Sequence, residues 1–233
     1  MGLKSLLKKL KYGVRADSET YIKHLRQRGM AIGDRTVLFA PMTNIIDETR
    51  PWMIKIGNDV QITAGVTILT HGYDWSVLKG VYGEVLGSAG GVEIGNNVFI
   101  GMHSTILKGT HIGNNVIIGA NSLVNRDIPD NCVAAGNPCR VIMSLQDYYE
   151  KRKEAQVKEA EELVYLYRNQ MNKEPDERAL HEFFWLFEDD PDQIPEIWKN
   201  MNRLVGNEQK TNQVMREHKK LYQGMYDFLN SIK

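Results

Sequence analysis

One histidine is a candidate for proton transfer. The chain has six histidines, and imidazole is the side chain best suited to act as a base near neutral pH. His71 lies in the second half of the hexapeptide Ile68–Tyr73 and close to a stretch, residues 73–91, that is rich in glycine and aromatic residues. Active-site clefts gather such histidines. A surface histidine beside a loop would have the same placement, so position alone leaves both interpretations open.

Several neighbours of His71 could assist it. Asp74 and Glu84 carry carboxylates that could orient the imidazole and stabilise its charged form. Each could equally be a solvated acid on a loop. The same stretch has three aromatic residues that either stack on the face of a sugar or anchor the loop: Tyr73, Trp75 and Tyr82.

The elements that would position these residues repeat every six positions. An aliphatic residue recurs at this interval in the second half of the repeat region: Ile94, Ile100, Ile106, Ile112, Ile118 and Val124. Gly follows four of them, and the fourth position after each is small or β-branched, except for the larger Ile128. The same phase appears earlier in the chain, at Ile32, Leu38, Ile56, Ile62 and Ile68.

A period of six fits neither an α-helix nor a simple alternating strand. It is typical of a parallel β-helix, in which one hexapeptide forms each face of a triangular coil and the aliphatic residue fills the axis. We expect each Gly to lie where the chain must turn. The phase breaks at 47–53 and again at 73–91, which we expect to be an extruded loop at the binding face.

Both flanks of the repeats have helical patterns. Residues 1–29 predict a helical cap, with Asp17 and Ser18 as candidate N-caps of a helix over 17–29. The β-helix domain is expected at 30–142 and an α-helical region at 143–233. Within that region we expect helices over 157–171, from Pro175 through Phe187, and over 214–232. The fold class is therefore mainly β, with helical extensions at both ends.

Composition limits the range of partners and compartments. Basic and acidic residues number 29 each, which gives no sign of a nucleic-acid partner. No apolar run is long enough to span a membrane and no signal peptide is evident, so we expect a cytoplasmic protein. Residues 1–12 resemble a short basic amphipathic helix, which either touches an anionic membrane surface or docks its leucines on the protein. Cys132 and Cys139 are expected to be small buried fillers.

The segment VEIGNNVFIGMHSTILKGTHIGNNVIIGANSLVNRDIPDNCVAAGNPCRVI, from Val92 to Ile142, resembles the signature of hexapeptide-repeat acyltransferases. These include galactoside, maltose and serine acetyltransferases and the sugar O-acetyltransferases of polysaccharide synthesis. The resemblance covers residues 30–142 and implies a left-handed parallel β-helix, a homotrimer with active sites between subunits, and acetyl-CoA as co-substrate. Phe99 stands where many members have Trp, and the two cysteines stand where Ser and Ala are common.

The resemblance also assigns roles. Acyl transfer needs a base, stabilisation of an oxyanion and alignment of both substrates, and the family places its catalytic histidine where His71 stands. By the same resemblance, Asn44 and Asp47 would hold a small-molecule or saccharide acceptor. Four residues on the later coils would contact coenzyme A: Gly101, Ala120, Arg126 and Arg140. The two arginines suit its phosphates.

Three alternatives stay open. The acceptor could be an amine on an amino-sugar nucleotide rather than a sugar hydroxyl. The chain could be a non-catalytic trimeric scaffold. It could also resemble zinc-dependent hydratases of carbonic-anhydrase type, with His71, His103 and His111 as ligands, but these residues occupy different positions in their hexapeptides. We therefore expect that no metal is required.

Overall fold

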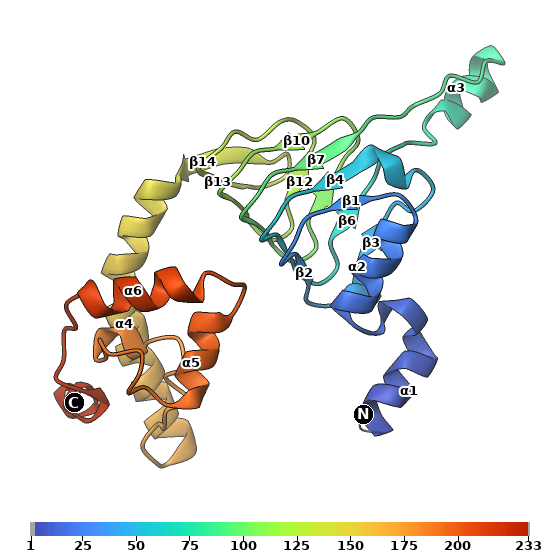
Figure 1. The fold of residues 1–233 in the computed structure, drawn as a ribbon. Coiled ribbons are helices and arrows are strands. Elements are labelled where there is room, and N and C mark those ends of the chain that lie inside the picture. Colours follow the sequence, from blue (N-terminus) through green and yellow to red (C-terminus); the bar gives the residue numbers. More distant parts are fainter. Residues whose placement is uncertain (1–2, 233) are drawn as a thin grey trace. The chain divides into compact units, whose positions relative to one another are not determined.

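The computed structural model describes residues 3–232 and consists of two units, Met1–Tyr148 and Tyr149–Lys233. The first unit contains every β-strand among the described residues (Figure 1). The boundary between the units lies after Tyr148. Strand β14 (Arg140–Ser144) therefore belongs to the first unit, and it runs past residue 142, where the repeats were expected to end.

The first unit is a stack of triangular coils whose three faces are parallel sheets (Figure 1). One sheet has the order β1 (Ala31–Ile32), β4 (Ile54–Ile56), β7 (Val92–Ile94), β10 (His111–Ile112). The second sheet has the order β14, β13 (Cys132–Ala135), β11 (Val116–Ile118), β8 (Val98–Ile100), β5 (Gln61–Ile62), β2 (Val37–Leu38). The third has the order β12 (Leu123–Val124), β9 (Thr105–Ile106), β6 (Thr67–Ile68), β3 (Ile45–Ile46). Among the described strands, only β14 pairs antiparallel, with β13, and this arrangement of parallel sheets is typical of a left-handed β-helix.

Register shows that one coil contains three hexapeptides. Val98 pairs with Val116, which occupies the same position three hexapeptides later, and the alternating strand residues point to the axis. The column formed by Ile62, Ile100 and Ile118 is fully buried. Burial of such aliphatic columns contributes roughly 25 cal/mol per Å² of apolar surface removed from water. The aliphatic residues predicted from the six-residue spacing are therefore the residues that pack in the core.

Each break in the six-residue spacing adds residues to one turn of a coil or removes residues from it. Besides the two expected breaks there is a third, a short addition between β2 and β3 that contains the helix η2 (Pro41–Thr43). The break at 47–53 contains a second short helix, η3 (Pro51–Met53). Ile128 pairs with Ile112, which is less than three full hexapeptides earlier, so it is an axial aliphatic after a shortened turn. This corrects its description as an oversized residue in the small position.

The glycine role predicted from the sequence is wrong for the residues that follow the aliphatics of the first sheet. A Cβ on Gly57 would lie 2.5 Å from the Gly95 carbonyl oxygen, and a Cβ on Gly95 would lie 2.7 Å from the Gly113 backbone. Glycine is needed there because adjacent coils approach closely. The turn itself is made two residues later, by residues such as Asn97, whose φ is +55°. Asn tolerates this left-handed conformation better than most residues do.

The N-terminal helices close the open edge of the first coil. Helix α1 (Leu3–Tyr12) leads through η1 (Gly13–Ala16) into α2 (Ser18–Gln27), and Asp17 caps α2 by accepting a hydrogen bond from the Thr20 backbone N–H, as predicted. Arg26 donates to the carbonyl oxygens of Ile32 and Gly33. The edge strand is therefore paired by side chains of the cap and is not left as a template for another strand.

The C-terminal unit has a core of its own, built from buried aromatic and aliphatic residues that include Phe184, Phe187, Trp198 and Phe228. Its helices are α5 (Glu196–Arg203), α6 (Glu208–Glu217) and α7 (Met225–Ser231), together with α4 (Leu145–Met171), whose first four residues belong to the first unit. The helix predicted from Pro175 through Phe187 is wrong. That segment forms turns and the short helix η4 (Phe184–Leu186), because its four apolar side chains enter the core from a compact loop.

The predicted last helix is two helices, because residues 218–224 interrupt it. Within the described part of the chain, no helix combines the length and apolarity needed to cross a bilayer. Cys132 and Cys139 are both buried and unpaired, as expected for fillers.

Candidate active site

His71 and Asp47 lie at the ends of neighbouring strands. Asp47 directly follows β3, and His71 comes three residues after β6, which pairs with β3. His71 also bridges to Ala89 across the base of the extruded loop, so both chain segments of the loop are fixed at this point. The loop contains helix α3 (Trp75–Tyr82), which stands out from the coils (Figure 1).

The two side chains form a hydrogen-bonded pair. His71 Nδ1 lies 2.6 Å from Asp47 Oδ2, with 16% of the His71 side chain exposed and 3% of the Asp47 side chain. Because the ionised carboxylate can only accept, Nδ1 carries the proton and Nε2 keeps its lone pair. Among the described residues Nε2 has no hydrogen-bond partner. The pair therefore presents the basic nitrogen of a histidine whose orientation is fixed.

The Asp47 carboxylate is held in its ionised form. Thr49 donates through its backbone N–H at 3.0 Å and its hydroxyl at 2.6 Å, and the Thr70 hydroxyl and backbone N–H also donate to it. Burial alone would raise the pKa of Asp47, but these bonds and the one from His71 outweigh burial and hold that pKa well below its usual range. A permanent negative charge therefore lies beside Nδ1 of His71.

A second cluster anchors the residue next to Asp47. The Glu48 carboxylate accepts hydrogen bonds from Arg15 at 3.0 Å, Tyr21 at 3.0 Å and His24 at 2.8 Å, which all come from the N-terminal cap. Burial opposes ionisation of Glu48, yet the bonds from His24, Arg15 and Tyr21 lower its pKa. The cap therefore fixes the chain immediately beside the carboxylate that orients His71.

The sequence missed this partnership. Asp47 was expected to hold the acceptor, and Asp74 or Glu84 to orient His71. In the structure, neither Asp74 nor Glu84 makes a hydrogen bond or ion pair with His71, so the orienting residue is Asp47. Thr49 and Thr70 were not singled out. The sequence did contain a signal for this pairing, namely Ile46. If Ile46 is taken as an axial residue and aligned with Ile68 on the next coil, Asp47 falls close to Thr70 and His71.

The aromatic candidates lie at different distances from the pair. The Tyr73 ring meets the His71 ring edge-on, with centroids 5.2 Å apart, and Trp75 packs against Tyr73 at 5.8 Å. Tyr73 is 68% exposed and Tyr82, at the end of α3, is 71% exposed. Tyr73 is therefore the aromatic residue that borders His71.

Most of the remaining candidates contact other parts of the coils. Asn44 is buried, and its Nδ2 donates to the Thr63 carbonyl oxygen at 2.8 Å, which ties two coils together. Gly101 and Ala120 stack on adjacent coils, so closely that a Cβ on Gly101 would lie 2.5 Å from the Ala120 nitrogen. Arg126 and Arg140 are both exposed, and Arg140 donates to the Cys139 carbonyl oxygen. The roles of these residues toward substrates stay predictions.

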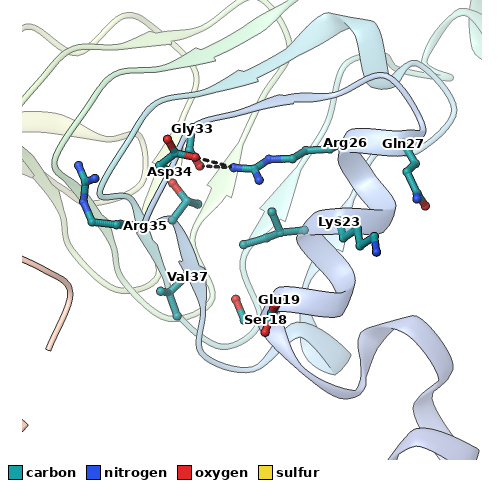
Figure 2. Close-up of a pocket in the computed structure, with 11 residues that line it drawn as sticks. Ser18, Glu19, Lys23, Arg26, Gln27, Gly33, Asp34, Arg35 and Val37 are labelled. Carbon is teal, nitrogen blue, oxygen red and sulfur yellow. Dashed lines mark hydrogen bonds and ion pairs between the residues drawn. The ribbon is translucent and has the colours of Figure 1, made fainter.

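In a hollow elsewhere on the first unit, two arginines are held by ion pairs. A cavity of about 740 Å³ lies between α2 and the first coil, and Figure 2 shows the residues that line it. Arg26 in its wall approaches Asp34 at 3.5 Å, and Arg35 forms a two-pronged ion pair with Asp59 at 2.6 and 2.7 Å. Over residues 3–232, no three His, Cys, Asp or Glu side chains gather as a metal site would require, so the suggested histidine trio does not meet within one chain.

Comparisons with known proteins identify sequences similar to this chain. The family model for the bacterial transferase hexapeptide (six repeats) matches residues 91–126. Protein CapG of Staphylococcus aureus is 41% identical over 127 residues, which are 54% of this chain and 73% of CapG. The galactoside O-acetyltransferase of Escherichia coli (strain K12) is 41% identical over 103 residues, or 44% of this chain, and the chain spans 48% of that enzyme.

A solved structure is also similar. The maltose O-acetyltransferase from Clostridium difficile 630 is 30% identical, with a TM-score of 0.44, and the match covers 59% of this chain and 82% of that one. The hexapeptide coils, the match to the repeat model and a relative 41% identical over 73% of its length together show that the chain belongs to the hexapeptide-repeat acetyltransferase family.

Proposed function

We propose that the protein transfers an acetyl group from acetyl-CoA to a hydroxyl of a sugar or polysaccharide precursor, with His71 as the general base. The observation that carries this proposal is the His71–Asp47 pair at 2.6 Å, which leaves Nε2 basic and directed away from the carboxylate. Membership of the acetyltransferase family and the 41% identity to a galactoside O-acetyltransferase support the reaction and the acceptor class.

The residues perform the steps as follows. Nε2 of His71 takes the proton of the acceptor hydroxyl while that oxygen attacks the thioester carbonyl carbon. Asp47 stabilises the resulting imidazolium and keeps its orientation. Collapse of the tetrahedral intermediate breaks the carbon–sulfur bond, and the proton on Nε2 passes to the departing thiolate. The products are an acetyl ester and free CoA thiol, and His71 returns to its neutral form.

We place coenzyme A along the later coils. Gly101 and Ala120 form a corner without large side chains, which suits an extended pantetheine arm that pairs with backbone amides. Arg126 and Arg140 are exposed beyond it and can meet the phosphates. Tyr73, beside His71, can stack on the acceptor ring.

We propose that the working form is a homotrimer with its active sites between subunits. Helix α3 supports this proposal because its apolar side chains are uncovered. None of its residues is buried, and Val77, Val81 and Tyr82 are 68%, 68% and 71% exposed. Apolar side chains gathered on a protruding element mark an interaction surface. A second copy that covers α3 would also close the site beside His71.

The test compares wild type with His71→Ala and the control His181→Ala, which removes an exposed histidine from the C-terminal unit. Calorimetry measures acetyl-CoA binding, and thiol release measures turnover with a panel of sugar acceptors. We expect all three proteins to bind acetyl-CoA and His71→Ala to lose roughly 10²–10⁴-fold in turnover. Unchanged turnover in His71→Ala would rule out its role as base, and no binding in wild type would favour a scaffold.

A further inference from the structure

The N-terminal 28 residues have a charge that differs sharply from the rest of the chain. They contain eight Lys or Arg and two Asp or Glu, a net charge of +6, whereas the whole chain is neutral. The remaining residues therefore carry a net charge of −6. Clustered cations of this kind attract a negatively charged partner.

Helix α1 combines this charge with exposed apolar side chains. Leu7 and Leu10 are 56% and 76% exposed, and their spacing of three puts them on one face of the helix. Val14, in η1, is also exposed. Leu3, Lys4 and Leu6 belong to the same pattern in the sequence, but their side chains lie outside the described residues.

The cations of α1 are available to a partner. Lys8, Lys9 and Lys11 are exposed, and none forms an ion pair with a described carboxylate. Arg15, by contrast, is engaged by Glu48. Of the two alternatives for residues 1–12, docking of the leucines on the protein is not seen for Leu7 and Leu10, and both lysines and leucines of the helix are exposed.

We propose that α1 binds the surface of an anionic membrane, with Leu7, Leu10 and Val14 entering the interface and Lys8, Lys9 and Lys11 meeting lipid phosphates. The combination distinguishes this partner from others. A second copy of the helix would bring like charges together, and a nucleic acid would leave the leucines without a role. A basic amphipathic helix gains from both apolar burial and lipid charge.

One ten-residue helix binds weakly, but the proposed trimer multiplies it. Rotational symmetry holds three copies of α1 at the same height along the axis, so they can reach one flat surface together. Linked contacts of this kind raise overall affinity by roughly 10²–10⁴-fold. This step rests on the proposed trimer. The membrane contact itself does not depend on the proposed chemistry.

The test is cosedimentation of the full-length protein with vesicles. Vesicles of phosphatidylcholine alone are compared with vesicles that contain about 30% phosphatidylglycerol, at low and high salt. We expect binding only to the anionic vesicles, and weaker binding as salt rises. Lys8→Gln and Lys9→Gln should each weaken binding about fivefold, and the double variant Leu7→Ser/Leu10→Ser should abolish it.

Matched controls come from α4. Lys158→Gln and Leu166→Ser replace an exposed lysine and an exposed leucine there, and both should bind like wild type. Equal binding to neutral vesicles, or no binding by wild type, would overturn the proposal. Loss of binding in the lysine variants with full binding in Leu7→Ser/Leu10→Ser would overturn it too, and would show a general polyanion site, such as one for nucleic acid. Turnover with soluble sugars, measured on the same variants, tests the proposed function separately.

Discussion

The carboxylate of Asp47 receives hydrogen bonds from Thr49, Thr70 and His71 while only 3% of its side chain is exposed. Its charge is therefore fixed by neighbours that belong to two stacked turns. Removing that charge while keeping the shape is the sharpest way to separate orientation from electrostatic support.

Asp47→Asn should lower turnover by up to about 10⁴-fold, the effect known for the same change in a comparable His–Asp pair. The amide can hold His71 Nδ1 in the wrong tautomer and cannot stabilise the imidazolium. Steady-state kinetics give the kcat, and acetyl-CoA calorimetry should show unchanged binding. A kcat within twofold of wild type would contradict the role given to Asp47.

At this scale the sequence singled out His71 but not its hydrogen-bond partner. His71 is conspicuous because it borders the loop, whereas Asp47 lies 24 residues earlier. In an uninterrupted coil, stacked positions are three hexapeptides apart, as Val98 and Val116 are. The added residues within 47–53 shift the register, so spacing alone pointed to the acids nearest in sequence, Asp74 and Glu84.

At the scale of the elements, the glycines that follow the strands of the first sheet, such as Gly57 and Gly95, allow adjacent coils to stack closely. Gly57→Ala should destabilise the protein by about 1–3 kcal/mol, because the new Cβ would lie 2.5 Å from the Gly95 carbonyl oxygen. Gly80→Ala in α3 is the control, since no atom lies within 4 Å of its added Cβ. Denaturant unfolding of both variants measures the difference. Equal stabilities would contradict the packing argument.

The carboxylates of Asp47 and Glu48 lead to a second prediction, which concerns the dependence of stability on pH. The pKa values of Asp47 and Glu48 are lower in the folded protein than in ordinary carboxyls, so the folded state binds fewer protons than the unfolded chain. Their stabilisation is complete above the ordinary carboxyl pKa values, 3.8 and 4.5, and is lost as the pH falls below them. Thermal unfolding of wild type between pH 7 and 3 should show a falling Tm.

Glu48→Gln isolates the share of Glu48 in that effect. Its Tm should be lower than that of wild type at pH 7, where the ionised cluster is intact, and the two should converge toward pH 3. A Tm difference that stays constant with pH would show that the Glu48 charge does not couple to stability.

The sequence predicted elements best where one period dominates. Six-residue spacing marked the axial aliphatics correctly because the coil repeats the same environment. It failed from Pro175 through Phe187, where four apolar residues at helical spacing serve a compact loop with only a short helix, η4. There the aromatic packing, including Phe184 stacked on Trp198 at 5.4 Å, overrides local helix preference.

For the molecule as a whole, the two units have separate cores. Every residue of the first core lies between Tyr21 and Cys139. A chain that ends after Tyr148 should therefore keep a cooperative unfolding transition in circular dichroism. Loss of that transition would show that residues 149–233 are needed for the β-helix to fold.

The mass of the particle in solution tests the proposed trimer. Three chains of 26.6 kDa give a particle of about 80 kDa, which sedimentation equilibrium distinguishes from a monomer or dimer. Val81→Asp, on the exposed side of α3, should shift the distribution toward monomer. A wild-type particle with the mass of a single chain at micromolar concentration would contradict the trimer.

The coil of three hexapeptides also has a consequence for how such a chain changes over generations. Each coil meets only its neighbours in the stack, and where no residues are inserted or deleted a strand returns to the same face after three hexapeptides. A duplication or deletion of one whole coil would preserve all three sheets and add or remove one layer. Indels of other sizes must bulge outward at a corner, as the segment carrying α3 does. Lineages of this fold should therefore vary in height by whole layers and diversify in specificity through corner insertions.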